Sequence, residues 1–174
     1  SEGIMSTIMR TFLLNDDQLI STKNSFIGFK VLANSSGRIT KWVPMKDNRY
    51  DLNNMAKKIN DYTKIIYIAN PDNPMGTHIS GLKICQALED LPEGCLFILD
   101  EAYSEFAPAS SLPDIAISDT RVIRLRTFSK AYGMAGARVG YGMAEESLIK
   151  SFEKIRNHFG MNRVAQKAAL EALN

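Results

Sequence analysis

The chain has 174 residues, of which 45% are hydrophobic and 23% are charged, and its formal net charge at pH 7 is +2. This length suits one domain, since domains usually contain about 50–250 residues. The small net charge argues against a nucleic-acid-binding surface, and apolar runs of at most five residues exclude a membrane-spanning helix, which needs about 20.

The first half of the chain alternates between helical and extended patterns. Ile4, Ile8 and Phe12 recur at helical spacing after Ser1, a good N-cap residue, so a helix is predicted over residues 2–13. The elements predicted next, in chain order, are a strand at 18–22, a helix at 25–34, a strand at 38–43 and a helix at 52–60.

The second half is more regular. A β-branched and aromatic strand at 64–69 stops at Asn-Pro-Asp-Asn-Pro, which neither a helix nor a central strand accommodates. The elements predicted after it are a helix at 80–91, strands at 96–99, 121–126 and 137–143, and two helices within 145–173 that are broken near Gly160. Strands that alternate with helices of about ten residues indicate βαβ units. The predicted fold is therefore a single α/β domain over residues 1–174, with a mainly parallel sheet and helices on both faces.

Cysteine and histidine are scarce. Cys85 and Cys95 form no CxxC pair and fall in apolar segments, so two buried thiols are expected in place of a disulfide. Free thiols suit a reducing compartment, and a cytoplasmic location is predicted. His78 and His158 have no partner motif, so no metal site is predicted.

Three of the apolar strands end in polar motifs. Asn73 follows the strand at 64–69, Asp100 the strand at 96–99, and Lys130 the strand at 121–126. Ligands of open parallel sheets bind at the carboxyl ends of the strands. If these strands are neighbours, an amide, a carboxylate and an ammonium group converge at one edge of the sheet.

These groups match the needs of a pyridoxal cofactor. Such a cofactor requires a lysine that can form a Schiff base, a carboxylate beside its ring nitrogen, and phosphate-binding donors. Lys130 and Asp100 suit the first two roles, and Tyr103 and Asn73 could hydrogen-bond the ring hydroxyl.

Residues that could donate hydrogen bonds to the phosphate lie in the same motifs and at the start of the chain. Ser129 supplies a hydroxyl and Arg138 a guanidinium group that suits bidentate pairing. Ser1, at the start of the first predicted helix, could place the phosphate at the positive end of the helix dipole.

At this point the sequence resembles a known family, the fold-type I pyridoxal-phosphate-dependent aminotransferases. Residues 70–76, Asn-Pro-Asp-Asn-Pro-Met-Gly, resemble their NPxNPTG motif, and residues 100–103, Asp-Glu-Ala-Tyr, resemble D-x-A-Y. Residues 127–133, Thr-Phe-Ser-Lys-Ala-Tyr-Gly, with 136–141, Gly-Ala-Arg-Val-Gly-Tyr, resemble the block that carries the lysine and an arginine eight residues later. The sequences of the last two motifs are most similar to those of the histidinol-phosphate aminotransferase group, and the resemblance covers essentially the whole chain.

The resemblance implies a role for each matching residue. Lys130 would form the Schiff base and shuttle a proton, Asp100 would pair the ring nitrogen, and Tyr103 and Asn73 would hold the ring oxygen. The aromatic that stacks on the ring would be Phe26. The phosphate would be bound by Thr127, Ser129, Arg138 and the backbone at Ser1.

The resemblance also has limits. Met75 stands where the motif usually has threonine. The family's N-terminal arm and C-terminal small domain are expected to lie outside this chain, which would then be the cofactor-binding large domain alone. A homodimer is implied for the full-length protein, with small-molecule substrates, an amino donor and a 2-oxo acid acceptor.

Each residue alone has a simpler interpretation. A lysine in a strand-to-helix turn is usually a solvated surface residue, Asp100 could be a cap, and Asn-Pro pairs are ordinary in turns. Four motifs in the family order, each just beyond a predicted strand, favour the cofactor interpretation instead.

The reaction leaves more alternatives, because one fold hosts several chemistries. Amino transfer between histidinol phosphate and 2-oxoglutarate is the leading hypothesis, followed by amino transfer of another amino acid. The remaining alternatives are a threonine-phosphate-type decarboxylase and a truncated, non-catalytic scaffold of the same fold.

Overall fold

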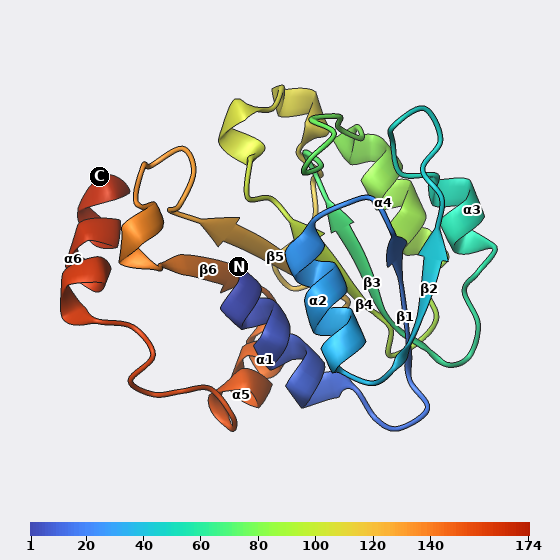
Figure 1. Cartoon of the computed structure of the whole chain (residues 1–174), viewed down its shortest axis with the longest axis horizontal. Helices are drawn as coiled ribbons and strands as arrows, with labels where there is room; N and C mark the ends of the chain where they lie inside the picture. The colour runs from blue at the N-terminus through green and yellow to red at the C-terminus, as the bar shows by residue number, and fades with distance from the viewer.

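A six-stranded sheet forms the centre of the computed structural model, which describes all residues from Ser1 to Asn174 (Figure 1). The strands are β1 (Gln18–Thr22), β2 (Ile39–Val43), β3 (Thr63–Ala69), β4 (Leu96–Asp100), β5 (Val122–Thr127) and β6 (Gly140–Met143). Their order across the sheet is β2-β1-β3-β4-β5-β6, and every pair is parallel except β5 with β6. The predicted α/β class with a mainly parallel sheet is confirmed.

Helices cover both faces of the sheet. One face packs against α1 (Glu2–Phe12), α2 (Ile27–Ser35) and α5 (Glu146–Glu153), and the other against α3 (Leu52–Ala56) and α4 (Gly81–Glu89). The last helix, α6 (Arg163–Ala172), lies at the β6 end of the molecule (Figure 1). There its Ala165 and Ala169 pack against Phe128 and Val139.

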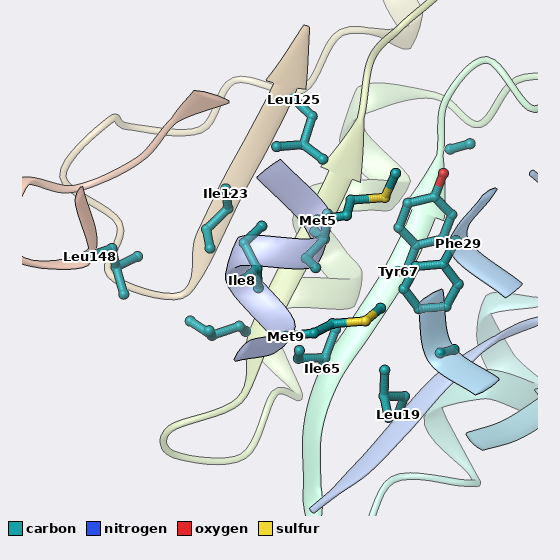
Figure 2. Close-up of a cluster of buried hydrophobic side chains, with 14 of the residues drawn as sticks. Met5, Ile8, Met9, Leu19, Phe29, Ile65, Tyr67, Ile123, Leu125 and Leu148 are labelled. Atoms are coloured by element: carbon teal, nitrogen blue, oxygen red, sulfur yellow. The ribbon is translucent and has the colours of Figure 1, made fainter. Parts of the chain in front are cut away.

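The two apolar cores follow from the alternation of side chains along each strand. On β3, Ile65 and Tyr67 point into the core under α1 and α2, whereas Ile66 and Ile68 belong to the core under α3 and α4. Figure 2 shows the first core, where the α1 side chains, Met5 among them, meet the strands. Burial of apolar side chains on both faces explains why the central strands read as continuous apolar runs.

Some predicted boundaries were wrong. The helix predicted over 52–60 ends at Ala56, since the N–H groups of Lys58 and Ile59 donate to the carbonyls three residues back, Met55 and Ala56, and so tighten the chain into turns. The strand predicted over 137–143 begins at Gly140, since a 3₁₀ turn, Ala135–Ala137, is followed by Arg138 in the left-handed conformation with φ 55°. The final break is wider than expected, from the end of α5 at Glu153 to the start of α6 at Arg163.

Both cysteines are free thiols. Cys95 is buried as expected, whereas Cys85 is partly exposed and so corrects the prediction of two buried thiols. Cys85 lies in the middle of α4, where its Sγ is 3.7 Å from the carbonyl oxygen of Asp114. No helix of the chain has both the length and the apolar character needed to cross a membrane.

Candidate active site

A cavity of about 250 Å³ opens at the carboxyl ends of β3, β4 and β5. These strands are adjacent and parallel, so the polar segments that follow them lie together. All of the side chains proposed from the sequence line this cavity, namely Ser1, Phe26, Asn73, Asp100, Tyr103, Thr127, Ser129, Lys130 and Arg138.

Asp100 is the most buried charged group in the cavity. It is the last residue of β4 and is 3% exposed. Its Oδ2 accepts a hydrogen bond from the Tyr67 hydroxyl at 3.0 Å, and its Oδ1 accepts one from the Ala102 N–H at 3.1 Å. Burial raises the pKa of Asp100 above its ordinary value, although the Tyr67 hydrogen bond opposes that rise. No lysine or arginine pairs with this carboxylate, so it can receive a cationic N–H from a ligand.

Tyr67 supports Asp100 and was not among the residues predicted for the site. It is fully buried on β3, and its ring stacks on Phe29 with centroids 4.0 Å apart and planes at 8° (Figure 2). Ala69 pairs in register with Asp100, and Tyr67 lies two residues earlier on the same face of β3. Strand alternation could have placed Tyr67 beside Asp100 once the order of the strands was known.

The amine of Lys130 lies on the open side of the cavity. Lys130 follows β5 by three residues and is exposed, and its Nζ is 5.2 Å from the centre of the Tyr103 ring. Tyr103 comes from the turn after β4, and Asn73 from the loop after β3. The expected amide, phenol and ammonium groups therefore border one space.

A second set of donors lies where α1 begins. The first-turn amides of a helix have no acceptor within the helix, and Glu2 and Gly3 line the cavity beside Ser1. Ser1 can approach β6 closely because residue 140 is glycine. A Cβ there would lie 3.1 Å from the Ser1 nitrogen and only 2.7 Å from the Arg126 carbonyl oxygen.

The remaining phosphate candidates face the same end of the cavity. The Thr127 hydroxyl oxygen accepts a hydrogen bond from the Ser129 N–H at 3.1 Å, which holds the turn after β5. The Arg138 guanidinium group is exposed and donates to the Ala135 carbonyl at 2.9 Å. Hydroxyls, a guanidinium group and a helix N-terminus together suit an anion such as a phosphate.

Phe26 forms an aromatic wall, and its position depends on Gly28. A Cβ on Gly28 would lie 2.5 Å from Cε1 of the Phe26 ring, so any larger residue would displace the ring. Gly28 was not predicted as a site residue, although its position in the sequence, two residues after the predicted Phe26, could have suggested it. The cavity thus combines an aromatic wall, a buried carboxylate, an amine and an anion-binding end. These features fit a small aromatic ring that carries a cationic nitrogen and a phosphate.

The fold and this set of groups are those of a family of enzymes. The sequence model described as aminotransferase class I and II matches residues 1–174, and the chain belongs to that family. This confirms the resemblance inferred from the motifs.

Individual relatives point to one group within the family. The chain is 36% identical to a histidinol-phosphate aminotransferase of Anaeromyxobacter sp. strain Fw109-5 over 99% of the chain and 49% of that protein. It is 40% identical to histidinol-phosphate aminotransferase 2 of Carboxydothermus hydrogenoformans over 91% of the chain and 45% of that protein. The crystal structure of histidinol-phosphate aminotransferase from Sinorhizobium meliloti, in complex with pyridoxal 5'-phosphate, superposes with a TM-score of 0.94 at 38% identity. That match covers 99% of this chain and 48% of the solved one, so the chain spans about half the length of its relatives.

Proposed function

We propose that this chain forms the cofactor-binding large domain of a pyridoxal-phosphate-dependent aminotransferase. The observation that carries the proposal is the buried, unpaired Asp100 carboxylate in the same cavity as the Lys130 amine. The Sinorhizobium meliloti relative, which binds pyridoxal phosphate, supports the choice of cofactor. Because the chain spans about half the length of its relatives, the complete substrate site is proposed to need residues beyond this domain.

The proposed reaction moves an amino group from histidinol phosphate to 2-oxoglutarate. When bound, pyridoxal phosphate supplies an aldehyde for a lysine amine and a ring that withdraws electrons from the substrate's α-carbon. The Asp100 carboxylate would hold a proton on the ring nitrogen, which strengthens that withdrawal. The Lys130 amine would attach the cofactor and then carry a proton from the substrate's α-carbon.

The other residues of the cavity would bind and orient. Phe26 would cover one face of the ring, and Tyr103 and Asn73 would hydrogen-bond its oxygen. The hydroxyls of Thr127 and Ser129 would bind the phosphate, together with Arg138 and the first turn of α1 at Ser1. A homodimer, implied by the resemblance, and a cytoplasmic location remain proposals, and sedimentation of the full-length protein tests the first.

Borohydride reduction in the presence of pyridoxal phosphate, followed by peptide mapping, tests the cofactor assignment. Reduction is expected to leave a phosphopyridoxyl group on Lys130 of the unmodified chain and none on Lys130→Ala. Lys150→Ala is the matched control, because Lys150 is an exposed lysine of α5 that does not line the cavity. Absence of an adduct, or an adduct spread over surface lysines, would refute the proposed cofactor site.

The products of the full-length enzyme test the reaction. Formation of glutamate from histidinol phosphate and 2-oxoglutarate is expected. Release of carbon dioxide from threonine phosphate would instead identify a decarboxylase. A lack of both reactions in a protein that still labels Lys130 would refute the proposed substrates but not the cofactor.

A further inference from the structure

A cluster of three buried polar side chains lies next to the cavity without lining it. Ser25 comes just before α2, Tyr50 from the segment between β2 and α3, and Asp72 from the loop after β3. None of them has a role in the function proposed above. Buried polar groups are costly unless they are paired, so their hydrogen bonds need an account.

The hydrogen bonds of the cluster run in one direction. The Ser25 hydroxyl donates to Oδ1 of Asp72. A hydroxyl has one proton, so the 2.5 Å contact between Ser25 and Tyr50 must have the tyrosine as donor. The Tyr50 oxygen in turn accepts the Ala69 N–H at 3.0 Å. The relay therefore passes from Ala69 through Tyr50 and Ser25 to the carboxylate.

The charge of Asp72 sets this direction. Its other oxygen, Oδ2, accepts a hydrogen bond from the Met75 N–H at 3.2 Å, so both carboxylate oxygens act as acceptors. Burial, and then the nearby Asp72 charge, hold the pKa of Tyr50 well above its usual value, and the phenol keeps the proton that it donates. Hydrogen bonds aligned in this way strengthen one another in a buried setting.

Three members of the relay line the cavity or directly precede a residue that does. Ser25 directly precedes Phe26, and Asp72 directly precedes Asn73. Ala69, whose N–H begins the relay, lines the cavity itself. Through Tyr50, the cluster thus ties the segment before α2 to the end of β3 and the loop after it, and these two segments meet at the cavity wall.

We propose that Ser25, Tyr50 and Asp72 are positioning residues that set the separation between Phe26 and Asn73 and so the orientation of the cofactor ring. This inference rests on the proposed function, because it requires pyridoxal phosphate in the cavity. A cluster that only stabilised the fold would lower the melting temperature when broken and leave the bound ring unchanged. A positioning cluster changes the environment of the ring as well.

The test uses Ser25→Ala and Asp72→Asn in the full chain. The asparagine keeps the shape of Asp72, but its NH₂ group must face either the Met75 N–H, which can only donate, or the Ser25 hydroxyl, which can accept from it only if its own proton turns away and the direction of the relay is lost. Each variant loses at least one buried hydrogen bond of the cluster that positions Phe26 and Asn73. The Kd for pyridoxal phosphate is therefore expected to rise about fivefold to tenfold. The visible circular dichroism of the bound cofactor, which reports the asymmetry around the ring, is expected to change in size or sign.

Ser111→Ala is the matched control. Ser111 is buried, and its hydroxyl donates to the Pro108 carbonyl at 2.7 Å, but it does not line the cavity or adjoin a residue that does. This variant is expected to lose a similar amount of thermal stability in the cofactor-free protein, with the Kd and the visible circular dichroism unchanged. If Ser25→Ala does not fold, Asp72→Asn and Tyr50→Phe decide the matter by the same measurements.

The outcomes separate the two proposals. Variants of Ser25 and Asp72 that melt earlier but keep the parental Kd and circular dichroism would overturn the positioning role and leave the proposed function standing. An unmodified chain that gives neither a visible circular dichroism signal nor a measurable Kd would overturn the proposed cofactor site, and this inference with it. Changes in both signals that are absent in Ser111→Ala would support it.

Discussion

Two neighbouring carboxylates at the end of β4 have opposite surroundings. Asp100 is 3% exposed and has no cationic side chain as a partner, whereas Glu101 is 1% exposed and contacts two arginines. The Glu101 oxygens lie 2.6 Å from Nη2 of Arg124 and 3.0 Å from Nε of Arg126. Both arginines alternate along β5 with Leu125, which belongs to the core on the Asp100 side, so the two acids face opposite sides of the sheet. A buried carboxylate that is paired with cations is part of the framework, whereas one that has hydrogen bonds but no cationic partner is free to bind a cationic ligand.

The largest expected effect comes from removing the ion pairs of Glu101. Glu101→Gln would leave Arg124, whose side chain is 19% exposed, without a carboxylate, and would leave Arg126, 20% exposed, with only the Glu105 carboxylate at 3.5 Å. The free energy of unfolding should fall by about 3 kcal/mol, because half of a buried ion pair is left uncompensated. Urea unfolding measures this. Glu146→Gln, which breaks an exposed pair with Lys150, is the control and should change the unfolding free energy by less than about 0.5 kcal/mol. Equal losses in the two variants would contradict the contrast.

A smaller effect is expected when the hydrogen bond that supports the Asp100 carboxylate is removed. Tyr67→Phe keeps the ring that stacks on Phe29 but deletes the hydroxyl that donates to Asp100 at 3.0 Å. The free energy of unfolding at pH 7 should fall by about 1.5 kcal/mol, as for other hydrogen bonds to charged groups. Carboxyl-carbon NMR titration should also show a higher pKa for Asp100, because the lost hydrogen bond had lowered it. An unchanged titration would show that Tyr67 does not influence the acid.

The smallest effect should have the opposite sign. The pKa of Asp100 in the folded chain lies above its ordinary value, mainly through burial. Its stabilising contribution is therefore present below the unfolded pKa of about 3.9 and is lost as the pH rises through the folded pKa. Asp100→Asn should raise the melting temperature of the cofactor-free chain by a few degrees at pH 7, and this gain should shrink toward zero near pH 4.

The same variant should bind pyridoxal phosphate more weakly than the unmodified chain. This reversal of sign, with a more stable fold but a poorer site, is the sharpest consequence of an unpaired buried acid. Thermal scans with and without the cofactor measure both parts. A variant that is less stable in both states would show that Asp100 belongs to the framework, as Glu101 does.

Local patterns predicted the parts of this molecule that depend on local chemistry. Apolar runs that stop at polar motifs were sufficient to place Asn73, Asp100 and Lys130 at strand ends, and one parallel sheet brings such ends together. The start of β6 was misplaced because a 3₁₀ turn and the left-handed Arg138 leave no periodic signal.

Other features depend on which strands are neighbours. The contact of Tyr67 with Asp100 needs β3 beside β4, and the two arginines reach Glu101 only because β5 is beside β4. The Ser25, Tyr50 and Asp72 cluster joins three loops whose approach no spacing predicts. Strand order is a property of the whole chain, so a single sequence without relatives shows these residues only as ordinary polar or aromatic positions.

The close approach of Ser1 to Gly140 has a consequence for the order in which the protein is made. The phosphate end of the cavity needs both the beginning of α1 and the start of β6. Residue 140 must therefore be synthesised and emerge from the ribosome before the cavity can form. Contacts between residues so far apart in sequence form late and slowly. A cofactor that binds only the closed cavity stabilises chains in which residue 140 is free to pack and not shorter nascent ones. The supply of cofactor during synthesis is then expected to govern how much folded protein accumulates.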